Sequence, residues 1–174
     1  WAIWTELKPT EKPKTNMGDI SFFENPTTEL LKTLNPNIVL VGLNISKKIN
    51  YSFGNFHSDY SSSHDYKLRY ALHETPLWGS YMTDIIKDFE EKASGKMMSF
   101  IRKNPDFMQE NIISFKQELC DIGSSKPILI ALGKDCYEIL NKNLEYKIFK
   151  VTHYSAPISK EKLREEFQDI ISKI

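Results

Sequence analysis

A short aliphatic run, IVLV at residues 38–41, places the strongest constraint on the fold of this chain. Its members are β-branched or aliphatic, and no polar residue interrupts them. This pattern is typical of a strand that is buried on both faces, as in a parallel sheet covered by helices. The run ends at Gly42. The residues after it are therefore expected at the carboxyl edge of a sheet, where α/β proteins place their ligand sites.

The rest of the chain alternates between strand-like and helix-like segments. Further strands are expected at residues 78–83, 127–133 and 147–151, with residues 84–87 as the turn out of the second strand. Helices are expected at 27–34, 65–73, 97–122 with a break at 104–105, after 133 as far as 140, and 160–171. This order predicts an α/β three-layer sandwich, in which a mainly parallel four-stranded sheet carries helices on both faces.

Length and composition predict a single domain. The 174 residues suit one domain, with residues 1–25 as an N-terminal extension. No run approaches the ~18–20 apolar residues of a membrane span, and no signal peptide opens the chain. Two cysteines supply neither a disulfide framework nor an iron–sulfur cluster, so a reducing cytoplasm is the expected location. We expect a monomer.

The charge balance gives no general attraction for nucleic acid. Lys and Arg number 23, and Asp and Glu also number 23. Contact with phosphate must therefore come from local groups such as Lys47, Lys48 and Lys160. Residues 44–70 hold four Lys or Arg and two Asp or Glu, interleaved with aromatic residues that include Tyr51 and Tyr60. Such a strip suits contact with a single strand or a flipped base, and a solvated loop explains it equally well.

Several segments, in chain order, resemble motifs of the uracil-DNA glycosylase superfamily. VLVGLNIS at 39–46 resembles the first motif of the mismatch-specific uracil/thymine branch, a hydrophobic strand followed by Gly-Leu-Asn-Pro-Gly. SFGNFH at 52–57 resembles the aromatic loop that follows, and YMTDIIK at 81–87 is similar to Tyr-Ile-Thr-Asn-Val-Val-Lys. LGK at 132–134 fits the turn after the third strand, and HYSAPIS at 153–159 resembles the closing His-Pro-Ser-Pro-Leu-Ser. The similarity spans about residues 37–167.

This resemblance implies a hydrolase that flips a damaged or mismatched base out of DNA and cleaves its N-glycosidic bond without a metal or other cofactor. It implies catalytic roles for Asn44, which positions the attacking water, and for His153, which donates toward the base oxygen. The other matched positions are Phe56, Phe53, Asp84 and Gly42 beside the base, and Ser155, Ile158 and Ser159 against DNA, with Ile158 as an apolar wedge.

The chemistry of these residue types is compatible with such roles. An aromatic ring suits the face of a base, with Phe56 the first choice and Phe53 the second. Asn is not a strong base, so Asn44 contributes positioning, whereas an imidazole such as His153 donates a hydrogen bond to developing negative charge. Plainer roles stay open: Asn44 closes a turn, His153 lies at the surface, and either Phe belongs to the core.

The sequence departs from the family pattern at Ile45 and Tyr154, which replace prolines, and at Asp84, which replaces the Asn that reads the base. An ionised carboxylate only accepts hydrogen bonds, so it meets a uracil carbonyl unfavourably. Asp84 therefore indicates a different base that offers N–H donors, a protonated Asp84, or a lost activity. A role in capping the following turn is the alternative.

Other classes of site find little support. Three of the four histidines lie within residues 57–73, but their spacing suits no zinc site. No Gly-x-Gly-x-x-Gly or Walker pattern predicts a dinucleotide or nucleotide triphosphate site. The leading alternative to a glycosylase is a superfamily relative that binds a nucleobase, nucleotide or nucleic acid without cleaving it. In a third interpretation the similarity at the strand ends is accidental.

Overall fold

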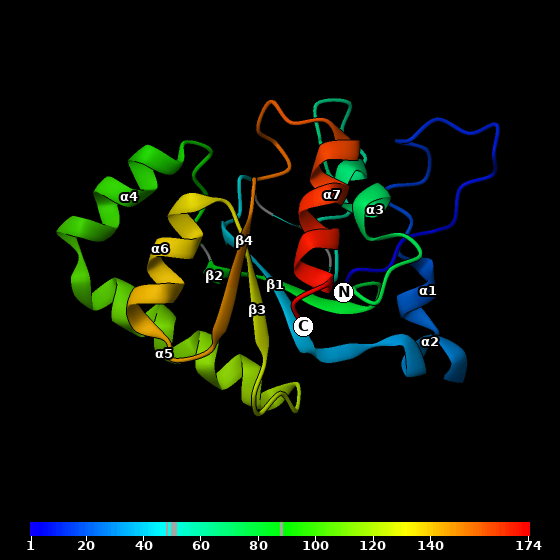
Figure 1. The fold of residues 1–174 in the computed structure, drawn as a ribbon. Helices are drawn as coiled ribbons and strands as arrows, with labels where there is room; N and C mark the ends of the chain where they lie inside the picture. The colour runs from blue at the N-terminus through cyan, green and yellow to red at the C-terminus, as the bar shows by residue number, and fades with distance from the viewer. Residues whose placement is uncertain (48, 50–51, 88) are drawn as a thin grey trace.

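The computed structural model describes residues 1–47, 49, 52–87 and 89–174. At its centre lies an all-parallel sheet of four strands in the order β2-β1-β3-β4. The strands are β1 (Asn35–Asn44), β2 (Ser80–Ile86), β3 (Ile128–Leu132) and β4 (Lys147–Val151). The helices are α1 (Ser21–Glu24), α2 (Thr28–Thr33), α3 (Tyr66–Leu72), α4 (Ser94–Lys103), α5 (Pro105–Asp121), α6 (Lys134–Asn143) and α7 (Lys160–Ile171). Figure 1 shows helices on both sides of the sheet, which confirms the predicted α/β fold class.

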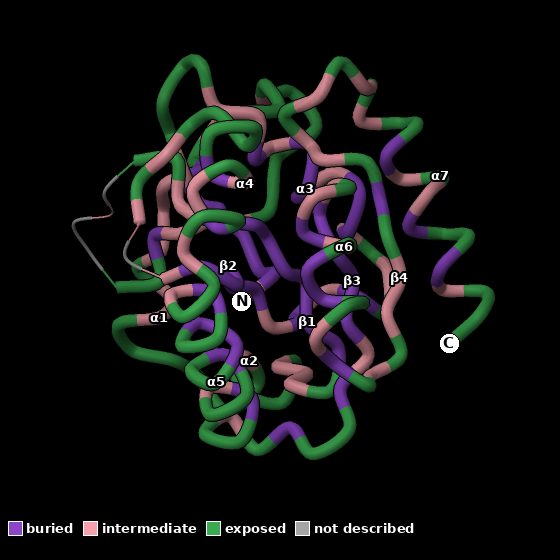
Figure 2. Tube along the Cα trace, turned by 90° about the vertical axis from the view of Figure 1, so that its left-hand side faces the viewer, coloured by how far each residue is buried: buried purple, intermediate pink, exposed green. Residues whose placement is uncertain are grey.

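Two apolar clusters hold the layers together. Alternate residues of β1 face opposite sides: Leu40 packs in the cluster with α3 and α7, and Val41 packs in the cluster with α4, α5 and α6. Both side chains are fully buried, as the aliphatic run predicted, and Figure 2 shows β1, β2 and β3 as the buried centre of the molecule. No helix among the described residues is long and apolar enough to cross a membrane.

The boundaries differ from the sequence prediction mainly in the first two strands. β1 is longer than the aliphatic run at both ends and includes Gly42 and Asn44. The prediction of a turn at residues 84–87 is wrong, because β2 continues to Ile86 and Asp84 pairs with Gly42 of β1. A carboxylate inside a buried strand gives a sequence pattern that resembles a turn. The break at 104–105 is confirmed, since Pro105 opens α5.

The connections create a crevice at the carboxyl edge of the sheet. From β1 the chain runs to α3 on one face and returns to β2, and from β3 it runs to α6 on the opposite face. The loops after these two neighbouring strands therefore separate above the sheet. Ligand sites of open parallel sheets lie at such a switch point in strand order.

Part of the first 25 residues, expected as an extension, packs into the domain. Trp4 and Met17 are buried in the cluster beneath α3 and α7. The Ala2 N–H donates to the Ser80 carbonyl at 2.8 Å, which attaches the segment to the start of β2. The buried Arg69 guanidinium of α3 donates to carbonyl oxygens of the same segment, at Thr5 (3.3 Å), Thr15 (2.9 Å) and Pro13.

Gly79 joins three segments at the opposite edge of the sheet, and we expect Gly79→Ala to lower the free energy of unfolding by about 3 kcal/mol. Its N–H donates to Ala2, its carbonyl accepts from Asn35, and its φ is +86°. A Cβ at this position would lie 1.9 Å from the Thr33 carbonyl oxygen. Urea unfolding measures the change.

Gly95→Ala is the matched control. Gly95 lies in α4, and a Cβ there would meet nothing within 4 Å. Because alanine favours a helix over glycine, this variant is expected to gain about 0.5–1 kcal/mol. Equal stability of Gly79→Ala and the wild type would contradict the close packing at Gly79.

Candidate functional site

A cavity of about 680 Å³ opens at the crevice above β1 and β3. Its lining comes from the end of β1, the loop 54–65, β2, the segment 91–94, the start of α6 and the loop 153–156. The residues predicted from sequence that line it are Asn44, Lys47, Phe56, Tyr60, Asp84, His153 and Ser155. The fold thus brings side chains from distant parts of the chain to one cavity, at the edge where the sequence placed them.

The remaining predicted positions lie elsewhere. Gly42 is beneath the carboxyl group of Asp84. Phe53 is outside the cavity, where it is 53% exposed and stacks on Phe23 at 5.1 Å. Ile158 packs against the cluster of α3 and α7, and Ser159 caps α7 by accepting from the Lys162 N–H. Lys48 and Tyr51 lie outside the described residues.

The close approach of Asp84 to Gly42 shapes the floor of the cavity. The two residues are partners in the parallel register of β1 and β2. A Cβ at position 42 would lie 2.1 Å from Asp84 Oδ1 and 3.3 Å from the ring of Phe56. Only glycine therefore leaves room for the carboxyl group, which explains the glycine in a strand that is otherwise aliphatic.

The Asp84 carboxyl group is deeply buried, and this burial raises its pKa to about 6. The Asn55 side chain donates to Asp84 Oδ2 at 2.8 Å, and this hydrogen bond and the charge of Lys87 limit the rise. The negative charges of Glu118 and Asp65 raise the pKa of Asp84 further. With a pKa about one unit below neutrality, the group is mostly ionised at pH 7 and accepts hydrogen bonds.

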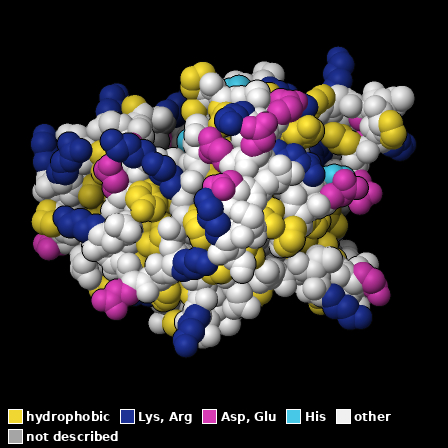
Figure 3. Space-filling view, viewed as in Figure 1, with side chains coloured by type: hydrophobic (Ala, Val, Ile, Leu, Met, Phe, Trp, Pro, Cys, Tyr) yellow, Lys and Arg dark blue, Asp and Glu magenta, His cyan; other side chains and the backbone are white. Residues whose placement is uncertain are grey.

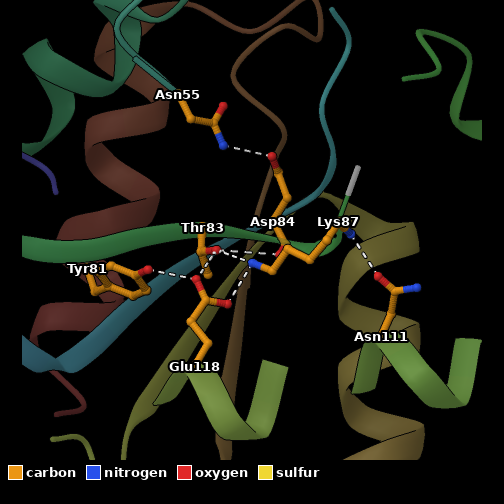
Figure 4. A network of polar contacts seen from close by, with 7 residues as sticks. All are labelled: Asn55, Tyr81, Thr83, Asp84, Lys87, Asn111 and Glu118. Carbon is orange, nitrogen blue, oxygen red and sulfur yellow. Dashed lines mark hydrogen bonds and ion pairs between the residues drawn. The ribbon is translucent and has the colours of Figure 1, made fainter. Parts of the chain in front are cut away.

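A second set of polar side chains holds β2 from its other face (Figure 4). Glu118 of α5 accepts from the Tyr81 hydroxyl at 2.6 Å and from the Thr83 hydroxyl at 2.7 Å. Its other oxygen pairs with the Lys87 ammonium at 2.6 Å. Asn111 accepts from the Lys87 N–H at 2.7 Å. Lys87 is thus engaged with α5, and it influences Asp84 through its charge rather than by contact.

The loop that carries Phe56 is fixed by the N-terminal segment. Trp4 donates its indole N–H to the Phe56 carbonyl at 3.2 Å. The buried His57 ring lies between the carbonyl oxygens of Asn55 at 2.8 Å and Ile3 at 2.7 Å, and stacks on Trp4. Phe56 itself has a φ of +63°, a conformation that non-glycine residues seldom adopt and that is held here by its surroundings.

His153 presents one ring nitrogen as a donor. Its Nδ1 accepts from the Ser155 N–H at 3.2 Å and lies 2.7 Å from the Ser155 hydroxyl oxygen. Burial lowers the pKa of His153, so the ring is neutral near pH 7 and carries its proton on Nε2. The ring stacks on Tyr154, whose ring meets Phe56 edge-on. Ser155, which the resemblance placed against DNA, therefore orients His153.

Asn44, the last residue of β1, has the structural role that the sequence left open as an alternative. Its amide nitrogen donates toward the carbonyl oxygens of Ile45 (2.9 Å), Phe89 (3.1 Å) and Glu91 (2.9 Å). These bonds tie the end of β1 to the chain after β2, so the turn-closing role is real and reaches across the cavity. The Oδ1 atom has no hydrogen-bond partner among the described residues, and it can accept from a bound water or ligand.

Two polar side chains of the site were missed by sequence reasoning. Asn55 stood inside an aromatic motif, and nothing in its sequence context singled it out. Asp65 was interpreted as part of the start of the following helix, which α3 confirms, but it is also a buried cavity residue. The Ser58 N–H donates to Asp65 Oδ2 at 2.9 Å, and burial raises the pKa of this carboxyl group.

The cavity lining mixes charges of both signs. Lys47, Lys92 and Lys134 contribute positive charge, and Glu91 and Asp135 contribute negative charge near them. Figure 3 shows Lys and Arg side chains gathered over the side of the molecule formed by α4 and α6. Within the part of the chain that the structure describes, no group of three or more His, Cys, Asp or Glu side chains is arranged to hold a metal ion.

Comparison of the chain with protein-family models, curated proteins and solved structures finds no match. The case for a function therefore depends on the geometry and chemistry of the cavity.

We expect Asp84→Asn to raise the free energy of unfolding at pH 7.5 by roughly 1–3 kcal/mol. The proton binds the folded state more tightly than the unfolded state, since the pKa rises from 3.8 to about 6 on folding. Ionisation therefore destabilises the folded protein as pH rises from about 4 to 6, by about 3 kcal/mol in total. An Asn in its place avoids this cost and still accepts from Asn55.

Urea unfolding at several pH values tests this expectation. The advantage of Asp84→Asn should shrink to roughly half at pH 5. Asp121→Asn is the control, because Asp121 is exposed at the end of α5 and its substitution makes the same chemical change away from the cavity. A variant that is less stable than the wild type at pH 7.5 would show that the buried charge does not oppose folding.

Proposed function

We propose that this protein is a DNA base-excision glycosylase of the uracil-DNA glycosylase-like superfamily, which hydrolyses the N-glycosidic bond of a damaged or mismatched base held in the cavity. One observation carries the proposal. The motif positions Asn44, Phe56, Asp84 and His153 come from four separate segments and line one cavity at the carboxyl edge of the sheet.

The residues of the cavity suit the steps of such a reaction. Cleavage leaves negative charge on the departing base, and the His153 Nε2–H can donate to a base oxygen as this charge develops. Ser155 fixes the ring and its tautomer for this task. Asn44 Oδ1 can accept from the attacking water, while the bonds of its amide nitrogen hold the side chain still. Asp84 and Asn55 offer polar contacts to the base edge.

Contacts with DNA would come from the rim of the cavity. Lys47, Lys92 and Lys134 lie there, and the net charge of the whole chain is zero. DNA binding through so few cations would depend on salt, because each phosphate contact releases a counterion.

A second candidate is a protein that binds a nucleobase or nucleotide in the same cavity without cleaving it. The engagement of the Asn44 amide with three carbonyl oxygens favours this candidate, because such bonds explain the residue without any catalytic role. Asp84 also favours this second candidate, because it replaces the Asn that reads the base in the uracil-DNA glycosylase pattern.

An abasic-site assay distinguishes the two candidates. Single- and double-stranded oligonucleotides that carry uracil, hypoxanthine, 8-oxoguanine or a G·T mismatch are incubated with the protein and cleaved by hot alkali. We expect scission of at least one substrate, and a rate about 100-fold lower for His153→Ala, because one donor to a developing anion contributes about 3 kcal/mol.

His73→Ala is the matched control, because His73 lies at the end of α3 and does not line the cavity. It should retain the wild-type rate. Absence of scission on every substrate, or equal rates for wild type and His153→Ala, would overturn the glycosylase mechanism. Retained nucleotide binding without scission would favour the second candidate.

A further inference from the structure

The polar pair at the floor of the cavity, Asn55 and Asp84, is not saturated by its own hydrogen bond. Asn55 Nδ2 donates one hydrogen to Asp84 Oδ2 at 2.8 Å (Figure 4). The amide nitrogen carries a second hydrogen, and each carboxylate oxygen has two lone pairs. Asp84 Oδ1 has no hydrogen-bond partner among the described residues, and it is not one of the fully enclosed polar atoms that lack one.

The orientation of Asn55 follows from chemistry. Asn55 turns its amide nitrogen toward Asp84 Oδ2, which suits a carboxylate, because a carboxylate only accepts hydrogen bonds. The loop holds this arrangement, because the Asn55 carbonyl contacts the His57 ring and the Phe56 carbonyl accepts from Trp4. Gly42 leaves space beside the Asp84 carboxyl group, because any Cβ at position 42 would collide with Asp84 Oδ1. Both partners line the cavity.

The pair therefore offers one N–H donor followed by two carboxylate acceptors. The Watson–Crick edge of cytosine has the same order of groups: an amino donor, a ring-nitrogen acceptor and a carbonyl acceptor. The edge that complements this order is that of guanine, which presents a carbonyl oxygen, a ring N–H and an amino N–H in a row. A flipped base is read through this edge.

We propose that Asn55 and Asp84 select a base with a guanine-type edge, in guanine itself or in a derivative altered at C8, and reject uracil. Asn55 donates to the base carbonyl, and Asp84 accepts from the ring N–H and the amino group. This assignment rests on the proposed function, in that the cavity holds a nucleobase. It assigns to Asn55 a direct part in specificity.

The edges of other bases fit less well. Hypoxanthine keeps the carbonyl and the ring N–H but lacks the amino donor. Uracil places a second carbonyl where the amino group would be, so this oxygen faces a carboxylate oxygen. Adenine presents an amino group and a ring acceptor, and leaves one acceptor of Asp84 opposite a lone pair. Sites with buried polar groups reject such analogues strongly, because the groups are left unpaired.

The test is equilibrium binding of nucleoside 5′-monophosphates to the full chain, measured by calorimetry at pH 7.5. We expect GMP to bind about tenfold more tightly than IMP and about 100-fold more tightly than UMP or AMP. Asp84→Asn replaces one acceptor with a donor, so it should weaken GMP at least tenfold and leave UMP unchanged or strengthened. Asn55→Ala should weaken GMP and IMP by similar factors, because both present the carbonyl.

Asp121→Asn and Asn141→Ala are the controls, since both residues are exposed and neither lines the cavity. They should retain the wild-type preference, and thermal unfolding of each variant shows that it is folded. UMP binding as tight as GMP binding, a GMP-to-UMP ratio unchanged in Asp84→Asn, or no binding of any nucleotide would overturn the proposal.

The failure of this proposal is distinct from failure of the proposed function. A preference for GMP without scission of any oligonucleotide would remove the glycosylase and leave the guanine-type reader. Excision of uracil from an oligonucleotide, with no preference for GMP in binding, would support the glycosylase and overturn the selection of a guanine-type edge. Scission at 8-oxoguanine that is lost in Asp84→Asn would support both.

Discussion

The carboxyl group of Asp84 above Gly42 is the contact on which the candidate site depends. It requires a glycine in the central strand, because a Cβ would lie 2.1 Å from Oδ1. It also requires β1 and β2 to pair in one register, since a shift by one residue would turn Asp84 to the opposite face. The long parallel pairing of two buried strands supplies this register. The sheet thus places a buried charge at a defined point beneath the cavity.

Burial of this charge opposes folding, and the surrounding structure compensates for it. Asn55 donates to the carboxylate, and Lys87, held by Glu118 and Asn111, contributes a positive charge nearby. The apolar clusters on both faces of β1 stabilise the folded protein and offset the free-energy cost of burying the Asp84 charge. Buried ionisable groups that lower the stability of the folded state in this way are common at functional sites, where a bound ligand can supply hydrogen bonds to them.

The N-terminal segment connects the core to the site. Trp4 donates to the Phe56 carbonyl, and the Ile3 carbonyl contacts the His57 ring. Arg69 of α3 binds carbonyl oxygens of the same N-terminal segment. The positions of Asn55 and Phe56 thus depend on residues about fifty positions earlier in the chain. A segment that resembles an extension in sequence acts as a support for the cavity wall.

The sequence by itself determined the α/β class, the four strands and the edge of the sheet where the cavity lies. Aliphatic runs and helix start signals are local patterns, and burial of both strand faces follows from them directly. Tertiary structure alone decided that β2 continues through Asp84, that Phe53 lies outside the cavity and that Asn55 faces Asp84. These outcomes depend on strand register and on contacts between distant segments, such as Gly42 with Asp84 and Trp4 with Phe56. No periodicity along the chain encodes them.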